Sequence, residues 1–371
     1  MNMHLKAKII YYSFLLYNQK ILFLCMNFLK ILEAATKLEY LIKNLKISDL
    51  SLSNNGISYL HYNSLRFSFT SFSNATVLYK IIEKSGKPMH ELIMVDHGGG
   101  IGFFSFLCKM AGVGTVVYHD INKELASDAK ILSRELNLPI EHMVIGNTKD
   151  LVEYCNTKNI MVNALGSRNV IEHIPDYNLF FIELSHLKSK QIVMQITTSA
   201  NIHNPIIRYQ HRKLHKRYDT LGPYSDMSQS KVLSQYSGNN LRKEILIASG
   251  ISTQDLDSLA LLSREMDADQ IKDAARDFIR NGMWPSKPMD KSNTRDPIYG
   301  AWVERLVRYR EYKKAANNAG FKIEYFIGEY DENYSNGIKK FLAKSLNMVL
   351  KRSPIFKKQL SAYLSFRVWR E

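Results

Sequence analysis

The chain has 371 residues, of which 45% are hydrophobic and 23% charged, so it can bury a large core and a disordered chain is excluded. Its net charge of +15 favours anionic partners such as nucleic acid, acidic glycans or the inner surface of a membrane, without choosing among them. Cys25, Cys108 and Cys155 lie too far apart for a C-x-x-C pair, so neither a disulfide framework nor a zinc knuckle is indicated, and a reducing cytoplasm fits best.

The N-terminal segment, residues 1–35, is rich in apolar and aromatic residues but is interrupted near its middle by Asn18, Gln19 and Lys20. A membrane-spanning helix needs about 20 apolar residues without such a break, and a secretory peptide needs a small-residue cleavage site that is not evident. An amphipathic surface helix, an N-terminal docking helix, and translated sequence upstream of a later start at Met26 remain open.

The segment before the first buried strand has two patterns. Residues 62–73 alternate Leu65, Phe67 and Phe69 with polar side chains, which predicts an edge strand or an extended loop. Residues 74–85 have the apolar spacing of a helix, which would precede the sheet.

A glycine cluster between two predicted strands is the most informative part of the sequence. Residues 92–95 form a continuous apolar run that ends at Asp96, as a strand buried on both faces does in a parallel sheet. A helix is predicted over 101–111, and a second buried strand over 115–119 ends at Asp120. Glycine lets the backbone turn sharply and approach a ligand, because no Cβ stands in the way. The glycines between the first strand and the helix are Gly98, Gly99, Gly100 and Gly102.

The spacing of these glycines separates two classes of cofactor. A dinucleotide fingerprint requires G-x-G-x-x-G directly after the strand. Counted from Gly98 the sixth position is Phe103, and counted from Gly100 it is Ser105, so this register fails. Asp120 does not discriminate between the classes, because a carboxylate at the end of the second strand binds ribose in nicotinamide enzymes too.

The pattern that does fit is D-x-G-x-G-x-G, formed by Asp96, Gly98, Gly100 and Gly102. It resembles motif I of the class I S-adenosylmethionine-dependent methyltransferases. The resemblance implies an α/β fold with a doubly wound, mostly parallel, Rossmann-like sheet, and it implies S-adenosyl-L-methionine as cofactor. The glycine loop would lie against the methionine part of the cofactor, and Asp120, followed by Ile121, would lie at the ribose hydroxyls. A purely structural turn is disfavoured, because strand, glycines, helix, strand and acid occur in order.

The next units continue the alternation of strands and helices. A helix over 123–137 and a third strand over 143–146 precede Asn147 and Thr148. In the resembled family a polar side chain at this point contacts the adenine amine, so both residues are cofactor candidates. A turn residue that caps the following helix is an equally good interpretation of Asn147.

A fourth strand is predicted over 160–165, followed by the sequence VIEHIPD at 170–176. This sequence resembles the motif that follows the fourth strand in many small-molecule methyltransferases. It makes His173 the best-placed general base and Glu172 the second candidate, with a structural role for His173 weighed equally. Asn159 stands where the family usually has an acid, and the distance from it to Glu172 is about four residues longer than expected.

No metal is assigned. Glu172 and His173 resemble the last part of an acid-x-x-Glu-His metal site, but Asn169 takes the place of the first acid, and an amide is a weaker ligand than a carboxylate. The histidines at 203, 211 and 215 match no metal motif either.

A fifth strand is predicted over 190–197, and the regular alternation then stops. Residues 200–300 contain helical stretches at 231–248 and 255–280, which we interpret as a helical lobe for the acceptor, with His203 and Tyr224 as reserve bases. A basic cluster near its start is either a solvated face or a clamp for a phosphate or carboxylate of the acceptor. Its cations are Arg208, Arg212, Lys213, Lys216 and Arg217.

The last part of the chain is predicted to complete the sheet and to end in a basic tail. A helix over 302–319 and an antiparallel strand near the sheet edge over 321–327 come first, and residues 337–371 are strongly basic. This tail either packs on the parent domain or lies on an anionic membrane. Its apolar stripe at helical spacing consists of Phe341, Leu342, Leu346, Val349 and Leu350.

The sequence thus predicts a helical N-terminal extension over 1–85, a cofactor-binding core over 86–199, a helical insertion over 200–300, and the end of the core with a helical tail over 301–371. The expected activity is methyl transfer, chiefly O-methylation, to a small-molecule or glycan-linked acceptor. An anionic acceptor is compatible with the positive net charge of the chain. A loose resemblance to methyltransferases of bacterial surface-polysaccharide pathways rests on the insertion, the basic tail and the sequence NTRDPIYGAW. An RNA methyltransferase and a non-catalytic scaffold are the alternatives. The expected location is cytoplasmic, with peripheral contact to the inner membrane surface left open, as is the oligomeric state.

Overall fold

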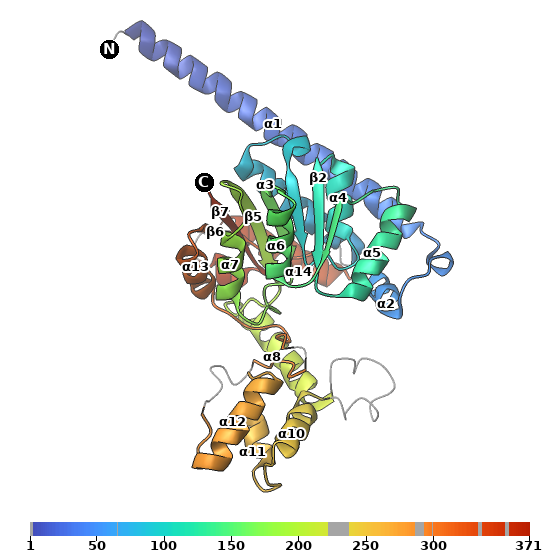
Figure 1. Cartoon of the computed structure of the whole chain (residues 1–371). Coiled ribbons are helices and arrows are strands. Elements are labelled where there is room, and N and C mark those ends of the chain that lie inside the picture. The colour runs from blue at the N-terminus through green and yellow to red at the C-terminus, as the bar shows by residue number, and fades with distance from the viewer. Residues whose placement is uncertain are drawn as a thin grey trace.

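The computed structural model describes residues 3–64, 66–221, 237–285, 293–298, 300–332, 336–352 and 356–371. Its centre is a seven-stranded sheet in the order β3-β2-β1-β4-β5-β7-β6 (Figure 1). The first five strands along the chain pair in parallel, and β7 is antiparallel to both of its neighbours. The strands are β1 (Ile93–His97), β2 (Thr115–Asp120), β3 (His142–Ile145), β4 (Ala164–Arg168), β5 (Ile192–Thr198), β6 (Lys322–Ile327) and β7 (Leu364–Arg370).

Helices cover both faces of this sheet, as a doubly wound α/β fold requires. The core helices are α1 (Met3–Lys43), α3 (Phe67–Ser85), α4 (Phe103–Ala111), α5 (Lys123–Glu135), α6 (Thr148–Thr157), α7 (Tyr177–Ser185) and α13 (Tyr309–Asn318). The remaining helices are η1 (Ile47–Asp49), α2 (Asn54–Ser64), η2 (Met89–Glu91), α8 (Pro205–Leu221), α10 (Gly238–Ala248), α11 (Leu256–Leu262), α12 (Ala268–Asn281), α14 (Gly337–Arg352) and α15 (Lys357–Leu360). No helix in the described ranges is both long enough and apolar enough to cross a bilayer.

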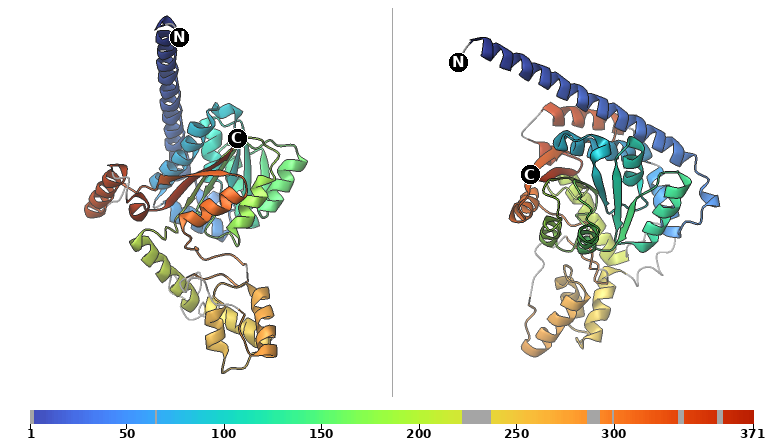
Figure 2. Two further views of the ribbon diagram at one scale, coloured as in Figure 1. Left: turned by 90° about the vertical axis from the view of Figure 1, so that its left-hand side faces the viewer. Right: turned by 45° about the horizontal axis from the view of Figure 1, so that its top comes forward.

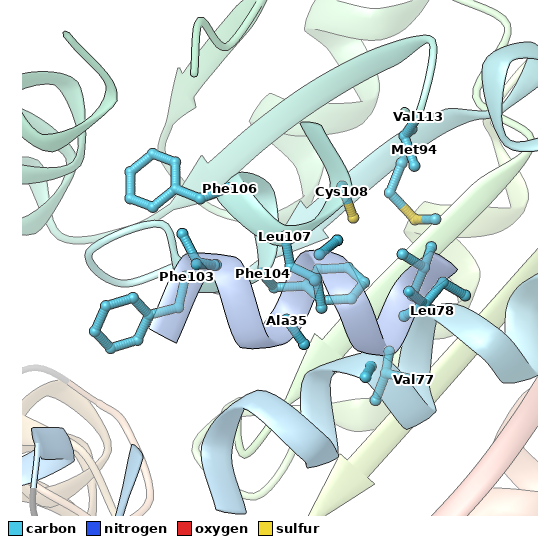
Figure 3. Packing of buried hydrophobic residues seen from close by; sticks show 14 of the residues in the cluster. Ala35, Val77, Leu78, Met94, Phe103, Phe104, Phe106, Leu107, Cys108 and Val113 are labelled. Atoms are coloured by element: carbon cyan, nitrogen blue, oxygen red, sulfur yellow. The ribbon is translucent and has the colours of Figure 1, made fainter. Parts of the chain in front are cut away.

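Alternating strand residues build two cores on opposite sides of the sheet. Met94 of β1 packs with α1, α3 and α4, whereas the next residue, Val95, packs with α6, α7 and α13. Figure 3 shows the first of these cores, where Phe104 and Leu107 of α4 lie beside Leu78 of α3. Because the strands are buried on both faces, they read as continuous apolar runs in the sequence. The doubly wound, mostly parallel sheet predicted from the sequence is therefore confirmed.

The strand predicted over 62–73 is wrong. Residues 54–64 form α2, and residues 67–85 form the single helix α3, so the predicted helix over 74–85 is its second half; Leu65 lies outside the described residues. The alternation misled because α3 turns polar side chains inward, with Thr70, Ser73 and Asn74 buried beside Phe67. A helix whose buried face is partly polar imitates the period of a strand.

The C-terminal tail is not all helical. Residues 364–370 form β7, which is inserted between β5 and β6 and is the one strand described that opposes the others. The strand over 321–327 is present as β6, but it runs in the direction of the parallel strands. The basic side chain of Arg367 concealed β7, because it is ion-paired with Glu83 and Glu324 rather than solvated.

The insertion forms a separate helical layer beyond the sheet edge (Figure 1). Its helices α10, α11 and α12 share a small apolar core of their own. The predicted stretch 255–280 divides into α11 and α12, and 231–248 is described only from α10 onward, because residues 222–236 lie outside the described ranges. Helix α8 connects this lobe to the carboxyl edge of the sheet.

Candidate active site

A cavity of about 1070 Å³ opens at the carboxyl edge of the parallel strands. Its floor consists of the ends of β1, β2, β4 and β5, and its walls come from α2, α3, α8 and the loops after β3 and β4. The volume lies at the upper end of the range of about 300–1,000 Å³ for small-molecule sites. There is room for a cofactor and an acceptor together.

The glycine loop is held tightly on the side of the sheet. The Gly98 amide donates to the His119 carbonyl (2.8 Å), the Gly100 amide donates to Asp120 Oδ2 (2.7 Å), and the Tyr118 hydroxyl donates to the Gly100 carbonyl (2.5 Å). Gly98, Gly100 and Gly102 have φ values of 70°, 53° and 90°, which glycine adopts readily.

The motif glycines serve different purposes. A Cβ at Gly98 would lie 2.3 Å from Val170, and a Cβ at Gly102 would lie 2.8 Å from Phe106, so both positions need glycine for packing within the protein. A Cβ at Gly100 would instead approach the cavity-lining Tyr59 hydroxyl at 3.3 Å. Gly98 and Gly100 both line the cavity, and Gly100 is the one at which the nearest neighbour of an added Cβ would lie at 3.3 Å rather than 2.3 Å.

Asp96 stabilises the start of α4. Its Oδ2 accepts hydrogen bonds from the backbone amide (3.0 Å) and the hydroxyl (2.7 Å) of Ser105. Burial raises the pKa of Asp96 to about 7, and the two bonds from Ser105 oppose this rise. Asp96 also lines the cavity, so it orders the loop and faces the predicted cofactor space at once.

Asp120 ends β2 as predicted and lines the same cavity. Its two oxygens accept bonds from the amides of Gly100 (2.7 Å) and Asn122 (2.8 Å). Each carboxylate oxygen has a further lone pair, so these bonds orient the group without saturating it. The carboxylate can therefore fix the glycine loop and still accept from a ligand.

Replacing Asp120 with alanine is expected to weaken the binding of S-adenosylhomocysteine about tenfold to a hundredfold, because hydrogen bonds to a charged group contribute about 1.5–3 kcal/mol. Calorimetry with S-adenosylhomocysteine and its 2′-deoxyribose analogue separates ribose binding from loop ordering. The deoxy analogue should bind the original protein more weakly than S-adenosylhomocysteine does. In the Asp120→Ala variant the affinities of the two ligands should be nearly equal. An equal deoxy penalty in both proteins means that Asp120 only orders the loop.

The other predicted cofactor residues line the cavity as well. Ile121 is 75% exposed. The Asn147 side-chain oxygen accepts from the Asp150 amide (3.1 Å), and the Asn147 amide donates to Asp150 Oδ2 (2.7 Å), which is a capping box at the start of α6. Capping therefore occupies the Asn147 side-chain oxygen, and contact with the adenine stays a prediction for Asn147 and Thr148.

Two histidines that the sequence analysis did not identify lie under this part of the cavity. The rings of His97 and His119 stack with centroids 4.8 Å apart. Burial lowers the pKa of both, so both are neutral near pH 7. His119 Nδ1 is buried without a hydrogen-bond partner among the described residues, and His119 lines the cavity.

His173 lies on the cavity wall after β4, as the sequence predicts. Its Nδ1 is 2.8 Å from the carbonyl oxygen of Trp302, which can only accept, so Nδ1 carries the proton. The Trp302 amide donates to the His173 carbonyl (3.1 Å), and the Trp302 indole donates to the Pro175 carbonyl (3.0 Å). These bonds fix the ring with Nε2 as the unprotonated nitrogen, and no other described residue bonds to it.

Glu172 is fully buried behind His173 and is not among the described residues that line the cavity. Its Oε1 accepts from the amide (3.0 Å) and the hydroxyl (3.2 Å) of Ser199. Burial raises the pKa of Glu172. The placement corresponds to a group that supports the turn after β5, and a catalytic role for it stays a prediction.

A histidine–carboxylate pair stands beside this cluster. His211 of α8 lines the cavity, and its two ring nitrogens face the Ile207 carbonyl (3.0 Å) and Glu304 Oε2 (2.5 Å). Burial alone lowers the pKa of His211, but the bond to Glu304 outweighs it and raises the pKa above the ordinary value. The backbone φ of Glu304 is 141°, which non-glycine residues rarely adopt, and strain of this kind gathers at functional sites.

The predicted basic clamp on α8 finds no support in its placement. Arg212, Lys213, Lys216 and Arg217 are exposed, and none of them, nor Arg208, is among the cavity-lining residues in the described part of the chain. His203 Nε2 accepts from the Tyr309 amide (3.2 Å), so it cannot serve as the reserve base that the sequence suggested; Tyr224 lies outside the described residues.

Arg168 is the cation that the sequence analysis missed. It ends β4, lines the cavity, and donates from Nη1 to the Thr70 carbonyl (2.9 Å) and to Asn74 Oδ1 (2.7 Å). It forms no ion pair with a described carboxylate, and burial lowers its pKa. The sequence prediction ended this strand at Leu165, and a strand three residues longer would have placed Arg168 at the ligand-binding edge.

No three His, Cys, Asp or Glu side chains in the described ranges are placed together to hold a metal ion.

No family model and no curated protein matches the chain. The solved structures to which the chain is similar include three that cover about the same share of it. They are the YcgJ protein from Bacillus subtilis (10% identity, 78% of this chain and 95% of that chain, TM-score 0.39), PKMT2 from Rickettsia typhi (13%, 77% and 49%, 0.38) and an S-adenosylmethionine-dependent methyltransferase from Mesorhizobium loti (12%, 77% and 95%, 0.34).

These likenesses are too distant to decide the fold, which the strand order of the sheet decides. Five parallel strands in the order β3-β2-β1-β4-β5, with an antiparallel strand inserted before the edge strand β6, form the sheet of the resembled family. The motif glycines and Asp120 lie where two adjoining strands, β1 and β2, end at its carboxyl edge. The chain therefore has the fold of the class I S-adenosylmethionine-dependent methyltransferases.

Proposed function

We propose that the protein transfers a methyl group from S-adenosyl-L-methionine to a hydroxyl group of a small-molecule or glycan-linked acceptor. The observation that carries this proposal is that Gly100, Asp120 and His173 all line the same cavity. A ligand-facing glycine loop, a ribose-binding acid and an oriented imidazole then meet in one space. The volume of about 1070 Å³ allows two molecules to be bound side by side.

The cofactor supplies a methyl group on a positively charged sulfur, which leaves as a neutral thioether. The protein therefore has to align the acceptor and to remove water more than to activate the methyl group. Gly100 and Asp120 hold the cofactor side, and His173 Nε2 accepts the proton of the acceptor hydroxyl. The Trp302 carbonyl keeps His173 in the tautomer that can accept.

The placement of Arg168 is evidence that the acceptor or the cofactor binds here through a negatively charged group. Its guanidinium faces the cavity without an ion-pair partner among the described carboxylates. A buried, unpaired charge is unfavourable until an anion binds to it. Arg66 lines the same wall, so this half of the cavity is suited to a carboxylate or phosphate.

Calorimetry tests the cofactor assignment. The protein is expected to bind S-adenosylmethionine and S-adenosylhomocysteine and not to bind NAD, because the glycine spacing fits the first class and fails for the second. Tight binding of NAD without binding of S-adenosylhomocysteine would refute the proposal. Binding without methyl transfer to any hydroxyl acceptor would favour the scaffold alternative, and salt-dependent RNA binding together with RNA methylation would favour the nucleic-acid alternative.

A further inference from the structure

We propose that the outer face of α14 docks on an anionic lipid surface. This face, called the outer α14 face below, is apolar and exposed. Ile338, Phe341 and Leu342 are 73%, 69% and 53% exposed, and Met348 and Val349 are 52% and 46% exposed. Their positions are separated by three, four and seven residues, which places them on one side of the helix as a stripe.

The outer face points away from the protein. The residues that α14 buries are Ala343, Asn347 and Leu350, which lie on the opposite side of the helix from Ile338 and Leu342. The left view of Figure 2 shows α14, in dark red, at the margin of the molecule. The stripe therefore cannot be explained as the core-facing side of an ordinary amphipathic helix.

The orientation of α14 is fixed by one buried amide. The Tyr330 amide donates to Asn347 Oδ1 (2.8 Å), and Asn347 Nδ2 donates to the Tyr330 carbonyl (3.0 Å) and to Glu332 Oε1 (2.8 Å). The Tyr330 hydroxyl accepts from Asn204 (2.9 Å), at the start of α8. This chain of bonds holds the outer face outward.

The charges of α14 select the occupant. The helix contains no acidic residue, and among the described carboxylates an ion pair is formed with Lys351, by Glu329 (3.2 Å). The cations without an ion pair to a described residue are Lys339, Lys340, Lys344 and Arg352. An apolar stripe flanked by free cations is complementary to acyl chains beneath anionic headgroups. A second copy of this chain would bring like charges together instead.

Docking would place the lipid surface beside one wall of the cavity. Leu346 of α14 lines the cavity, as do Tyr330 and Asp331 of the segment to which Asn347 is bonded. An acceptor carried on a lipid would then enter, from the side of the bilayer, the cavity that His173 also lines. This consequence rests on the proposed function, whereas the docking itself does not.

Vesicle flotation with the full chain tests the docking. The protein is expected to float with vesicles of phosphatidylcholine and phosphatidylglycerol, much less with phosphatidylcholine alone, and less as salt rises. The double substitution Phe341→Gln and Leu342→Gln should reduce the partition coefficient between vesicles and water at least about tenfold. Each of Lys339→Gln, Lys340→Gln and Lys344→Gln should reduce it roughly fivefold.

The matched control is the double substitution Leu261→Gln and Ile279→Gln, which removes apolar side chains of similar exposure, 60% and 57%, from the helical lobe. It should leave flotation unchanged. Unchanged binding of S-adenosylhomocysteine by every variant shows that the cofactor site is intact. Failure of the original chain to float, or equal flotation of the α14 double variant, overturns the proposal. So does a dimer that the same double variant dissociates, since the face would then join two copies.

Discussion

Replacing Gly100 with leucine is expected to abolish detectable binding of S-adenosylhomocysteine, with at least about a hundredfold loss of affinity, while the protein remains folded. The new side chain would start 3.3 Å from the Tyr59 hydroxyl and extend into the cavity. The loop cannot move aside, because Asp120 and Tyr118 hold its amide and carbonyl from the sheet side. Ligand and side chain would therefore compete for one space.

Gly86→Leu is the matched control for this substitution. Gly86 has a φ of 64°, close to the 53° of Gly100, but a Cβ there would meet nothing within 4 Å. Both variants carry the strain of a left-handed non-glycine residue, about 1–2 kcal/mol, and should show similar losses of melting temperature. Only Gly100→Leu should lose the ligand by calorimetry. If both variants bind equally well, the loop does not face the cofactor.

The parallel part of the fold could be predicted because its signals are local. A strand buried on both faces is a continuous apolar run, and residues 92–95 and 115–119 show this directly, as does the glycine cluster after the first of them. The first half of α3, over 67–73, and the strand over 364–370 could not be predicted in this way. Their character depends on partners distant in sequence, which bury the polar side of α3 and pair Arg367 with Glu83.

The site residues likewise fall into those that local sequence predicts and those that it does not. Asp120 and His173 are marked by short motifs, so their positions on the cavity wall could be predicted. The Trp302 carbonyl that fixes the His173 tautomer is 129 residues away in sequence and is a backbone group, so no side-chain pattern reports it. The pair His211 and Glu304 spans 93 residues for the same reason. Spatial meetings of this kind require the fold.

Replacing His173 with alanine is expected to lower turnover by about a hundredfold or more while affinity for S-adenosylhomocysteine stays within a few-fold. Its Nε2 is the ring nitrogen left to accept a proton, and the ring lies on the cavity wall. Steady-state turnover with a hydroxyl acceptor, calorimetry and thermal unfolding measure the three quantities separately. The loss should appear in turnover of the bound complex and not in the melting temperature beyond that of the control.

His142→Ala supplies that control. His142 is half-buried, bonds through Nδ1 to the Tyr154 hydroxyl (3.2 Å) and is not among the described residues of the cavity wall. The substitution His142→Ala removes the same atoms as His173→Ala from a comparable environment. It should therefore lower the stability of the protein slightly and leave turnover near the original value. If His173→Ala instead lowers melting temperature and cofactor affinity together, with turnover of the bound complex intact, then His173 only positions the loop that Trp302 fastens. His211 cannot replace it as the base, because acceptors at both ring nitrogens hold its two protons in place.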